Sequence, residues 1–163
     1  MNTLLLAAVL LCPIVHGSSV GQHDLVLPRD LAGKPAVVVV TFGQDQQIEA
    51  DSWLPLVQDI QSANPGIGYK EISVSDINDR LTRGTVDAYY SFAVQDPQVY
   101  ENTVVLCAKR SSFMRALHLP TDHTIYTLLL DASGHVRWRS AGIMTPLHGE
   151  ELREVVAELL RKG

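Results

Sequence analysis

The sequence predicts an α/β domain in which a mixed sheet is covered by helices, and three observations predict it. Residues 36–42 form a continuously apolar, β-branched run bounded by Pro35 and Gly43, which is typical of a strand buried on both faces. An amphipathic segment follows that strand. The C-terminal third has the pattern of a hairpin followed by a helix. Strands and helices that alternate in this way favour a layered α/β domain.

The first helix is expected over residues 47–63. Its apolar residues recur at the spacing of one helical face: Trp53, Leu56, Val57 and Ile60. Pro55 lies inside the segment and should kink it, because proline removes a backbone donor. Residues 64–66, Asn-Pro-Gly, end the helix.

The middle of the chain predicts two further strand and helix pairs. Residues 69–74 and 103–107 read as strands. A helix interrupted by a glycine is expected over residues 76–93, and a shorter one over 112–119, before a proline.

The C-terminal third predicts a β-hairpin and a final helix. Residues 124–130 and 135–141 read as its strands, and 131–134 as a turn that ends in glycine. Thr145 can cap a helix with Pro146 at its first position. The predicted order of elements is therefore β-α-β-α-β-α-β-β-α.

Composition limits the size and the partners of the protein. The chain has 163 residues, enough for one domain, and is 46% hydrophobic and 19% charged. Its net charge is −5 and no basic run is present, so nucleic acid is not expected as a partner. The six histidines show no metal-ligand spacing, and no metal or cofactor is predicted.

The N-terminus predicts a secretory leader. Residues 4–15 are apolar without a break, which matches a signal peptide and is short of the roughly 20 residues that span a membrane. With cleavage after Gly17, residues 1–17 are the signal peptide and 18–163 the domain. The protein would then be exported, periplasmic or secreted. A hydrophobic first helix and an uncleaved anchor are the alternatives, since no Lys or Arg precedes the run.

Cysteine usage excludes an internal disulfide. Cys12 lies inside the predicted leader, which leaves Cys107 as the one cysteine of the mature chain. A buried structural cysteine at the end of a strand is the plainer interpretation. A reactive thiol stays open, because Lys109 and Arg110 follow it and could lower its pKa.

The chain resembles the thioredoxin superfamily in three features. They are a buried strand followed by a helix containing Pro55, the Asp-x-x-Gly hairpin turn at residues 131–134, and Gly142 before the helix at Pro146. The resemblance implies a thioredoxin-like three-layer sandwich. Its mixed central sheet would be flanked by helices and would end in a C-terminal β-hairpin plus helix.

The resemblance also locates the active site of that superfamily. Its two redox cysteines fall at Gln47 and Ala50, and its cis-proline falls at Tyr126. Neither cysteine position can form a thiolate, and dithiol exchange needs one thiol to attack and a second to resolve. The resemblance therefore implies a groove, walled by residues 43–50 and Tyr126, without its dithiol chemistry.

A narrower resemblance is to the mitochondrial ATP synthase assembly factors that chaperone the proton-channel subunit. It rests on Ser-Trp-x-Pro at 52–55, on the stretch 129–138 that ends in Val-Arg-Trp, and on Gly142, Thr145 and the acidic pair 150–151. Those factors are redox-inactive thioredoxin folds. The predicted leader differs from theirs, so their client cannot be carried over to this chain.

Two arginines suggest a second binding feature. Alternation along residues 135–141 sends Arg137 and Arg139 to one face of the strand, and Val136 and Trp138 to the other. Two arginines on one face could bind a carboxylate or an acidic segment. A solvated outer face is the alternative.

Two hypotheses follow. In the first, the protein is a redox-inactive binding, chaperone or assembly factor for a protein client, with a membrane protein among the candidates, and is not an enzyme. In the second, it is a redoxin-type enzyme that reduces peroxide or disulfide with Cys107. The candidate binding residues of the first hypothesis are Gln47, Ala50, Trp53, Tyr126, Arg137 and Arg139.

Overall fold

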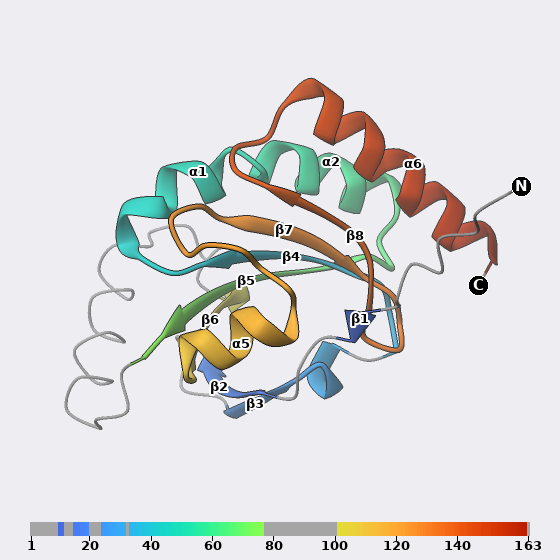
Figure 1. The fold of residues 1–163 in the computed structure, drawn as a ribbon. Coiled ribbons are helices and arrows are strands. Elements are labelled where there is room, and N and C mark those ends of the chain that lie inside the picture. The colour runs from blue at the N-terminus through green and yellow to red at the C-terminus, as the bar shows by residue number, and fades with distance from the viewer. Residues whose placement is uncertain (1–9, 12–14, 20–23, 32, 77–100, 163) are drawn as a thin grey trace, which may run out of the picture.

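A computed structural model describes residues 10–11, 15–19, 24–31, 33–76 and 101–162. Its centre is a mixed sheet with helices on both faces (Figure 1). Five strands form the middle of the sheet in the order β8-β7-β4-β5-β6. Their bounds are Ala36–Thr41 for β4, Gly68–Ser75 for β5, Thr103–Cys107 for β6, Tyr126–Leu130 for β7 and His135–Ala141 for β8.

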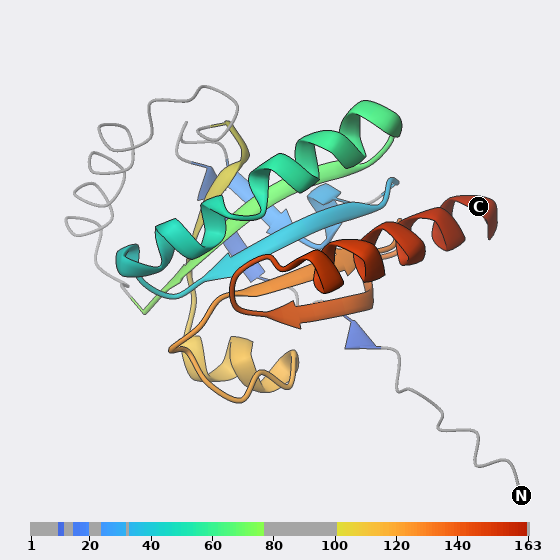
Figure 2. The ribbon, with the colours of Figure 1, turned by 90° about the horizontal axis from the view of Figure 1, so that it is seen from above.

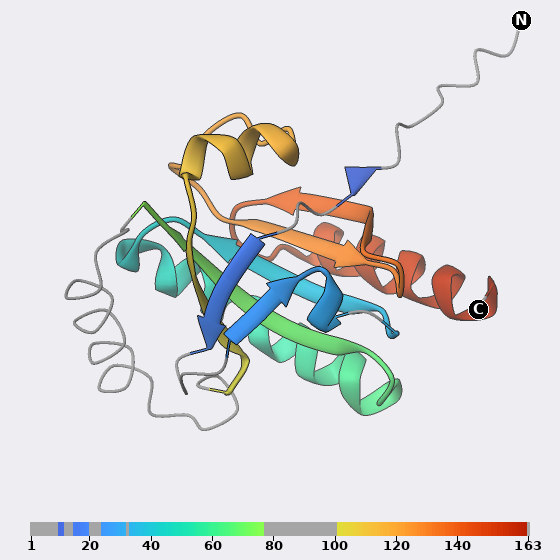
Figure 3. The ribbon, with the colours of Figure 1, turned by 90° about the horizontal axis from the view of Figure 1, so that it is seen from below.

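The pairing makes this sheet mixed. Strands β4, β5 and β6 run parallel to one another, while β7 runs antiparallel to both β4 and β8. Figures 2 and 3 show this arrangement from above and from below. Because β4 to β6 are parallel, their carboxyl ends meet at one edge of the sheet, where ligands bind in open α/β sheets.

Helices cover the two faces unequally. Helices α1 (Gln47–Asp51), α2 (Leu54–Ala63) and α6 (Pro146–Lys162) lie over one face (Figure 2). Helix α5 (Arg110–Ala116) covers the other face, together with the short 3₁₀ helix η1 (Arg29–Leu31). Strand β4 contributes side chains to the cores on both faces of the sheet, because Val37 and Val39 face α2 while Val38 and Val40 face α5. The prediction of a strand buried on both faces is confirmed.

The predicted first helix is divided. It appears as α1 and α2, joined through Ser52 and Trp53, and a short 3₁₀ helix η2 (Gln44–Gln46) precedes them. Pro55 occupies the first turn of α2, where its missing N–H removes no hydrogen bond. Proline therefore begins a second helix here instead of kinking one long helix.

The remaining predicted elements agree in type with the structure where it describes them. Strands β6 and β8 have the predicted bounds, and the expected helix over residues 112–119 is α5, two residues earlier at its start. Thr145 caps α6, since its Oγ1 accepts a hydrogen bond from the His148 N–H at 3.2 Å. The helix expected over residues 76–93 lies almost entirely outside the described residues.

Three further strands lie at the two sides of the sheet. Strand β1 (Leu10–Leu11) pairs with β8, while β2 (Val15–Ser19) pairs with both β6 and β3 (Asp24–Leu27). β1 and the beginning of β2 belong to the segment 1–17, and cleavage of that segment stays a prediction. Among the described residues, none of the helices combines the length and the apolarity of a membrane span.

Candidate functional site

The site implied by the superfamily resemblance lies where β4 ends and α1 begins. Gln46, in the connection between them, is buried and makes two hydrogen bonds. Its Oε1 accepts from the Phe42 N–H and its Nε2 donates to the Asp122 carbonyl, both at 2.8 Å. One side chain therefore ties the segment after β4 to the segment before β7. The sequence analysis did not single out Gln46, because its partner is 76 residues away.

Gln47, which the superfamily resemblance places at the first cysteine position, is held by two carboxylates. Its Nε2 donates to Asp51 Oδ1 at 2.9 Å, one turn along α1, and to Glu71 Oε2 at 3.4 Å, on β5. A side-chain amide, which donates hydrogen bonds, therefore stands where the resemblance expects the nucleophilic thiol. Gln47 is half-buried.

Glu71 is the most unusual group at this site. Only 1% of its surface is exposed, and its Oε1 has no hydrogen-bond partner among the described residues. Burial raises the pKa of Glu71 to about 7, since desolvation penalises the charged form, and the nearby Asp51 carboxylate raises it further. The hydrogen bond from Gln47 acts in the opposite direction. Sequence patterning missed this residue, because a glutamate within a strand usually faces solvent.

Ala50 and Trp53 lie in the core and not on a surface that a client could touch. Both have no exposed area, and both belong to the cluster between the sheet and α2. The Trp53 Nε1 donates to the Gly142 carbonyl at 3.0 Å, and its ring stacks on His148 and meets Trp138 edge-on. The prediction that these two side chains bind a client directly needs correction: they anchor α1 and α2 to the end of β8.

Tyr126, which the resemblance places at the superfamily's cis-proline, is also buried. It begins β7, and its hydroxyl donates to the Thr121 carbonyl at 2.8 Å. Its ring meets Phe42 edge-on with centroids 6.2 Å apart. The side chain of Tyr126 is therefore part of the core and does not form a wall of the predicted groove, which corrects that expectation.

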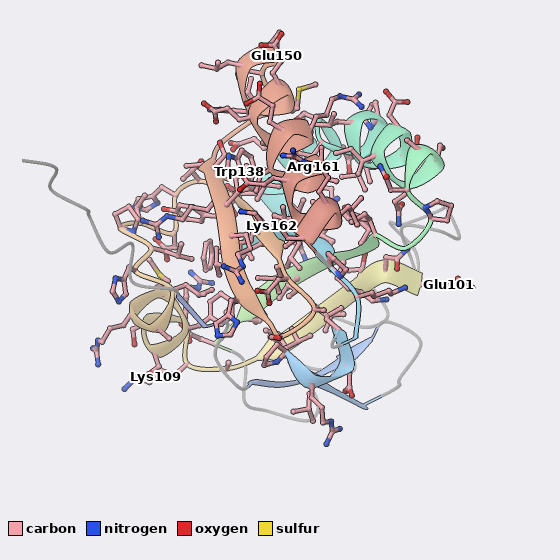
Figure 4. The ribbon with its side chains drawn as sticks, turned by 90° about the vertical axis from the view of Figure 1, so that its right-hand side faces the viewer. Glu101, Lys109, Trp138, Glu150, Arg161 and Lys162 are labelled. Carbon is pink, nitrogen blue, oxygen red and sulfur yellow. The ribbon has the colours of Figure 1, made fainter. Side chains whose placement is uncertain are left out.

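The two arginines of β8 lie on opposite faces of the sheet, and the prediction that they share one is wrong. The register of β8 against β7 shifts so that Leu129 faces Trp138 while Leu130 faces Val136. Arg137 is therefore the extra residue of a β-bulge, which breaks the alternation. Val136 packs with the core beneath α5. Trp138 packs with the core beneath α6 and is labelled in Figure 4.

Each arginine also has its own partner within the chain. Arg137 Nε donates to Asp131 Oδ2 at 2.7 Å, beside the second half of α6. Arg139 Nη1 donates to the Leu117 and His118 carbonyls at 2.9 and 3.2 Å, at the end of α5. The hydrogen bonds of Arg137 and Arg139 therefore join elements of the fold to one another.

A charged cluster around Arg110 adjoins the site and was missed by the sequence analysis. Arg110 Nη1 donates to Asp122 Oδ2 and its Nη2 to the Phe42 carbonyl, both at 2.9 Å. Its guanidinium also lies 5.9 Å from the centre of the Phe42 ring. The hydrogen bond from Arg110 lowers the pKa of the Asp122 carboxyl. Sequence reasoning mentioned Arg110 only for its closeness to Cys107.

An open cavity of about 590 Å³ lies over this cluster. Both cationic and anionic side chains line it, so it presents no single charge to a ligand. Its charged and titratable lining comprises Asp76, Lys109, Arg110, Asp122 and His123. Among the residues that the structure describes, no three His, Cys, Asp or Glu side chains are grouped closely enough to hold a metal ion.

Cys107 ends β6 and pairs through its backbone with Ser75 on β5. Strand β6 is two strands away from β4, about 10 Å at ordinary strand spacing, and both end at the same edge of the sheet. Placement of the Cys107 side chain lies outside what the structure describes. The reactivity of Cys107 stays a prediction.

Comparison with solved structures identifies the fold. Yeast Sco1 with copper bound matches with a TM-score of 0.63 at 16% identity, over 91% of this chain and 93% of that one. The fold is thioredoxin-like. BsSco, a member of the Sco family of cytochrome c oxidase assembly proteins, matches with a TM-score of 0.62 at 14% identity, over 92% and 94% of the two chains.

A third match extends the same fold to an exported protein. The exposed lipoprotein thioredoxin Etrx1 of Streptococcus pneumoniae has a TM-score of 0.58 at 15% identity, over 90% of this chain and all of that one. At these identities the likeness establishes the thioredoxin-like fold alone. No family model and no curated protein matches the sequence. The narrower resemblance to ATP synthase assembly factors therefore gains no support and stays a prediction.

Proposed function

We propose that this thioredoxin-like protein is a redox-inactive binding or assembly factor for a protein client in an exported compartment. One observation carries the proposal. At the first cysteine position, Gln47 donates hydrogen bonds to Asp51 and Glu71, and at the second, Ala50 is buried against the sheet. Neither position offers a sulfur to a disulfide, so the nucleophile and the resolving thiol of dithiol exchange are both missing.

The rest of the site supports binding without chemistry. The hydrogen bonds of Gln46 and Arg110 join the segment after β4, the segment before β7 and the beginning of α5. These hydrogen bonds keep the surface between the three segments rigid. A rigid surface loses less conformational entropy when it binds a partner. Sco-family assembly proteins and an exposed lipoprotein with the same fold make assembly and export reasonable roles for it.

Capture of a client tests the proposal. A photo-reactive amino acid placed at Ile48, which is 84% exposed and lies between the two former cysteine positions, would be activated in intact cells. Wild type and C107S should capture the same protein in equal amounts, without a bond that dithiothreitol breaks. Failure to capture a specific protein at several surface positions, or capture only through a reducible bond that needs Cys107, would overturn it.

A lone-thiol enzyme is the second candidate, and the position of Cys107 favours it. The backbone of Cys107 ends β6 at the sheet edge where β4 also ends, next to Lys109 and Arg110. In such an enzyme the Cys107 thiolate attacks one oxygen of hydrogen peroxide and becomes a sulfenic acid, while the O–O bond breaks and hydroxide leaves and takes a proton from solvent to become water. An external dithiol then reduces the sulfenic acid to the thiol and is itself oxidised to a disulfide.

Native thiol labelling separates the two candidates. A thiol with a lowered pKa reacts with iodoacetamide at pH 6, because its thiolate is already present. We expect the folded protein to resist labelling at Cys107 and to be labelled fully after denaturation. Labelling of the folded protein at the rate of the denatured one, or faster, would favour the enzyme.

A further inference from the structure

Exposed apolar side chains gather at one end of the molecule. Among the described residues, four large hydrophobic side chains are substantially exposed. Three of them border the end of the sheet where α1 begins: Ile48 at 84%, Leu147 at 63% and Ile143 at 55%. Exposed apolar side chains that lie together, unlike single scattered ones, mark a surface where a partner can bind. The fourth, Leu160, lies near the opposite end of α6.

One hydrogen bond joins the two segments that carry these three side chains. The Met144 N–H donates to Ser52 Oγ at 3.0 Å, which fixes the β8–α6 connection against the junction of α1 and α2. Ile48 lies one turn before Ser52 and thus on the same side of α1. The connection passes beside this junction in both views (Figures 1 and 2). Ile143 precedes Met144 and Leu147 follows it by three residues, so all three exposed side chains belong to segments that this one contact holds together.

The same end of the molecule is acidic. No lysine or arginine occurs in residues 35–69 or in residues 140–152, the two segments that build this surface. Acidic side chains flank the three apolar residues, and all of them reach solvent at least in part: Asp45, Glu49, Asp51, Glu150 and Glu151. Figure 4 shows Glu150 at one end of α6 and the cations Arg161 and Lys162 at the other. We call the three apolar residues and these five acidic residues the α1-end surface.

We propose that the α1-end surface docks a basic amphipathic segment of a partner polypeptide, one with apolar side chains flanked by lysine or arginine. This inference rests on the proposed binding function and specifies its ligand. Apolar side chains on the partner would bury Ile48, Ile143 and Leu147, while its cations would lie near the surrounding carboxylates.

Charge argues against other occupants. An anionic membrane surface would be repelled by the five carboxylates of the α1-end surface. Two copies of this chain joined symmetrically through the same surface would bring those carboxylates together. A head-to-tail contact with the basic end of α6 in a second copy is the remaining alternative, and the experiment below includes it.

A designed peptide tests the proposal on the full chain. The probe is an 18-residue fluorescent peptide of leucine and lysine in an amphipathic helical pattern, measured by anisotropy at 50 and 300 mM NaCl. One control peptide carries glutamate in place of lysine, and another carries serine in place of leucine. We expect binding of the leucine–lysine peptide alone, weakened several-fold by the higher salt.

Paired variants tie that binding to the surface. The variants I48S and L147S should each weaken it about five- to tenfold, the usual range for an anchor residue, while L160S changes it less than twofold. D45N/E49Q should weaken binding at low salt, and E154Q, further along α6, should leave it unchanged. All these positions reach solvent, so the variants are expected to fold, and circular dichroism checks this.

Four outcomes would overturn the proposal. One is equal binding of the leucine–glutamate peptide, and another is an equal effect of I48S and L160S. The third is concentration-dependent self-association, seen by sedimentation, that I48S abolishes and the peptide cannot displace; this would make a second copy the occupant. The fourth is capture of a specific client, by a photo-reactive residue at a surface position other than 48, that I48S and L147S do not weaken; this would contradict the docking surface and leave the proposed function standing.

Discussion

Gln47 lies directly above the buried carboxyl group of Glu71, with its Nε2 3.4 Å from Glu71 Oε2. A residue at the former cysteine position is therefore coupled to an ionisable group inside the protein. The other oxygen of Glu71 has no hydrogen-bond partner among the described residues. The neutral form of this carboxyl group thus fits its surroundings better than the charged form.

Stability should depend on the protonation of Glu71. Burial raises its pKa from an ordinary 4.5 to about 7 in the folded chain. Between these values the folded chain holds a proton that the unfolded chain has released, so the free energy of unfolding falls as pH rises across this window. E71Q should remove that fall and be more stable than wild type by roughly 3 kcal/mol at pH 8.

Urea unfolding at pH 5 and pH 8 checks this prediction. The exposed Glu154 offers a matched control, and E154Q should keep the pH dependence of the wild type. An E71Q variant that is no more stable than wild type at pH 8 would show that the ionised carboxyl group is well accommodated.

Replacement of Gln46 should loosen the site. In Q46A the Phe42 N–H and the Asp122 carbonyl both lose their partner, and we expect the free energy of unfolding to fall by about 1 to 3 kcal/mol. The exposed neighbour Gln44 serves as the control, since Q44A should change stability by less than about 0.5 kcal/mol. Equal urea midpoints for the two variants would show that Gln46 does not hold these segments together.

Asp131 should stabilise the hairpin of β7 and β8. Its carboxylate accepts hydrogen bonds from the Ser133 N–H, the His135 N–H and Arg137 Nε at 2.7 to 3.0 Å. Burial opposes the charge of Asp131, but these hydrogen bonds outweigh it and lower the pKa of the carboxyl group. D131A should therefore lower the free energy of unfolding by about 2 to 3 kcal/mol at pH 7.

The pH dependence of that loss gives a second check. A lowered pKa means that the stabilisation by Asp131 is present above about pH 3.8 and is lost as pH falls through the folded-state value. The surface pair of Asp59 and Arg153 is the comparison, and D59A should cost less than about 1 kcal/mol. A similar cost for both variants would contradict the role given to Asp131.

Much of the fold could be predicted from local pattern. The continuous apolar runs of β4 and β6 reflect burial on both faces of the sheet. The helical period of the apolar residues in α6 reflects burial of one helix face. Both patterns can be read directly from the sequence. The bulge at Arg137 could not be predicted, because a strict alternation does not reveal where an extra residue enters a strand. Strands β1 and β2 were missed because their segment reads as a leader.

The site was harder to predict than the fold. The positions of Gln47 and Ala50 followed from counting along a motif, but their surroundings depend on contacts between distant elements. Gln46 bonds to a residue 76 positions away and Glu71 lies 24 positions from Gln47, and no local pattern encodes such distances. The resemblance placed Trp53 and Tyr126 at motif positions, and their burial became visible only in the structure.

Cysteines restored at the two motif positions should create thiol chemistry. Q47C/A50C supplies an attacking thiol and a resolving thiol at the beginning of α1, so we expect it to reduce insulin in the presence of dithiothreitol at least fivefold faster than wild type. The single variant Q47C lacks the resolving thiol and should form trapped mixed disulfides. A folded Q47C/A50C that reduces no insulin would show that more than the two sulfurs has been lost.

The proposed function depends on the absence of thiol chemistry in the natural chain, and one comparison measures this directly. Wild type and C107S would each be given hydrogen peroxide or insulin, with dithiothreitol as the reductant, and their rates of turnover recorded. We expect the two proteins to be indistinguishable from each other and from buffer. Turnover by wild type that C107S abolishes would contradict a redox-inactive binding factor and identify Cys107 as the catalytic thiol.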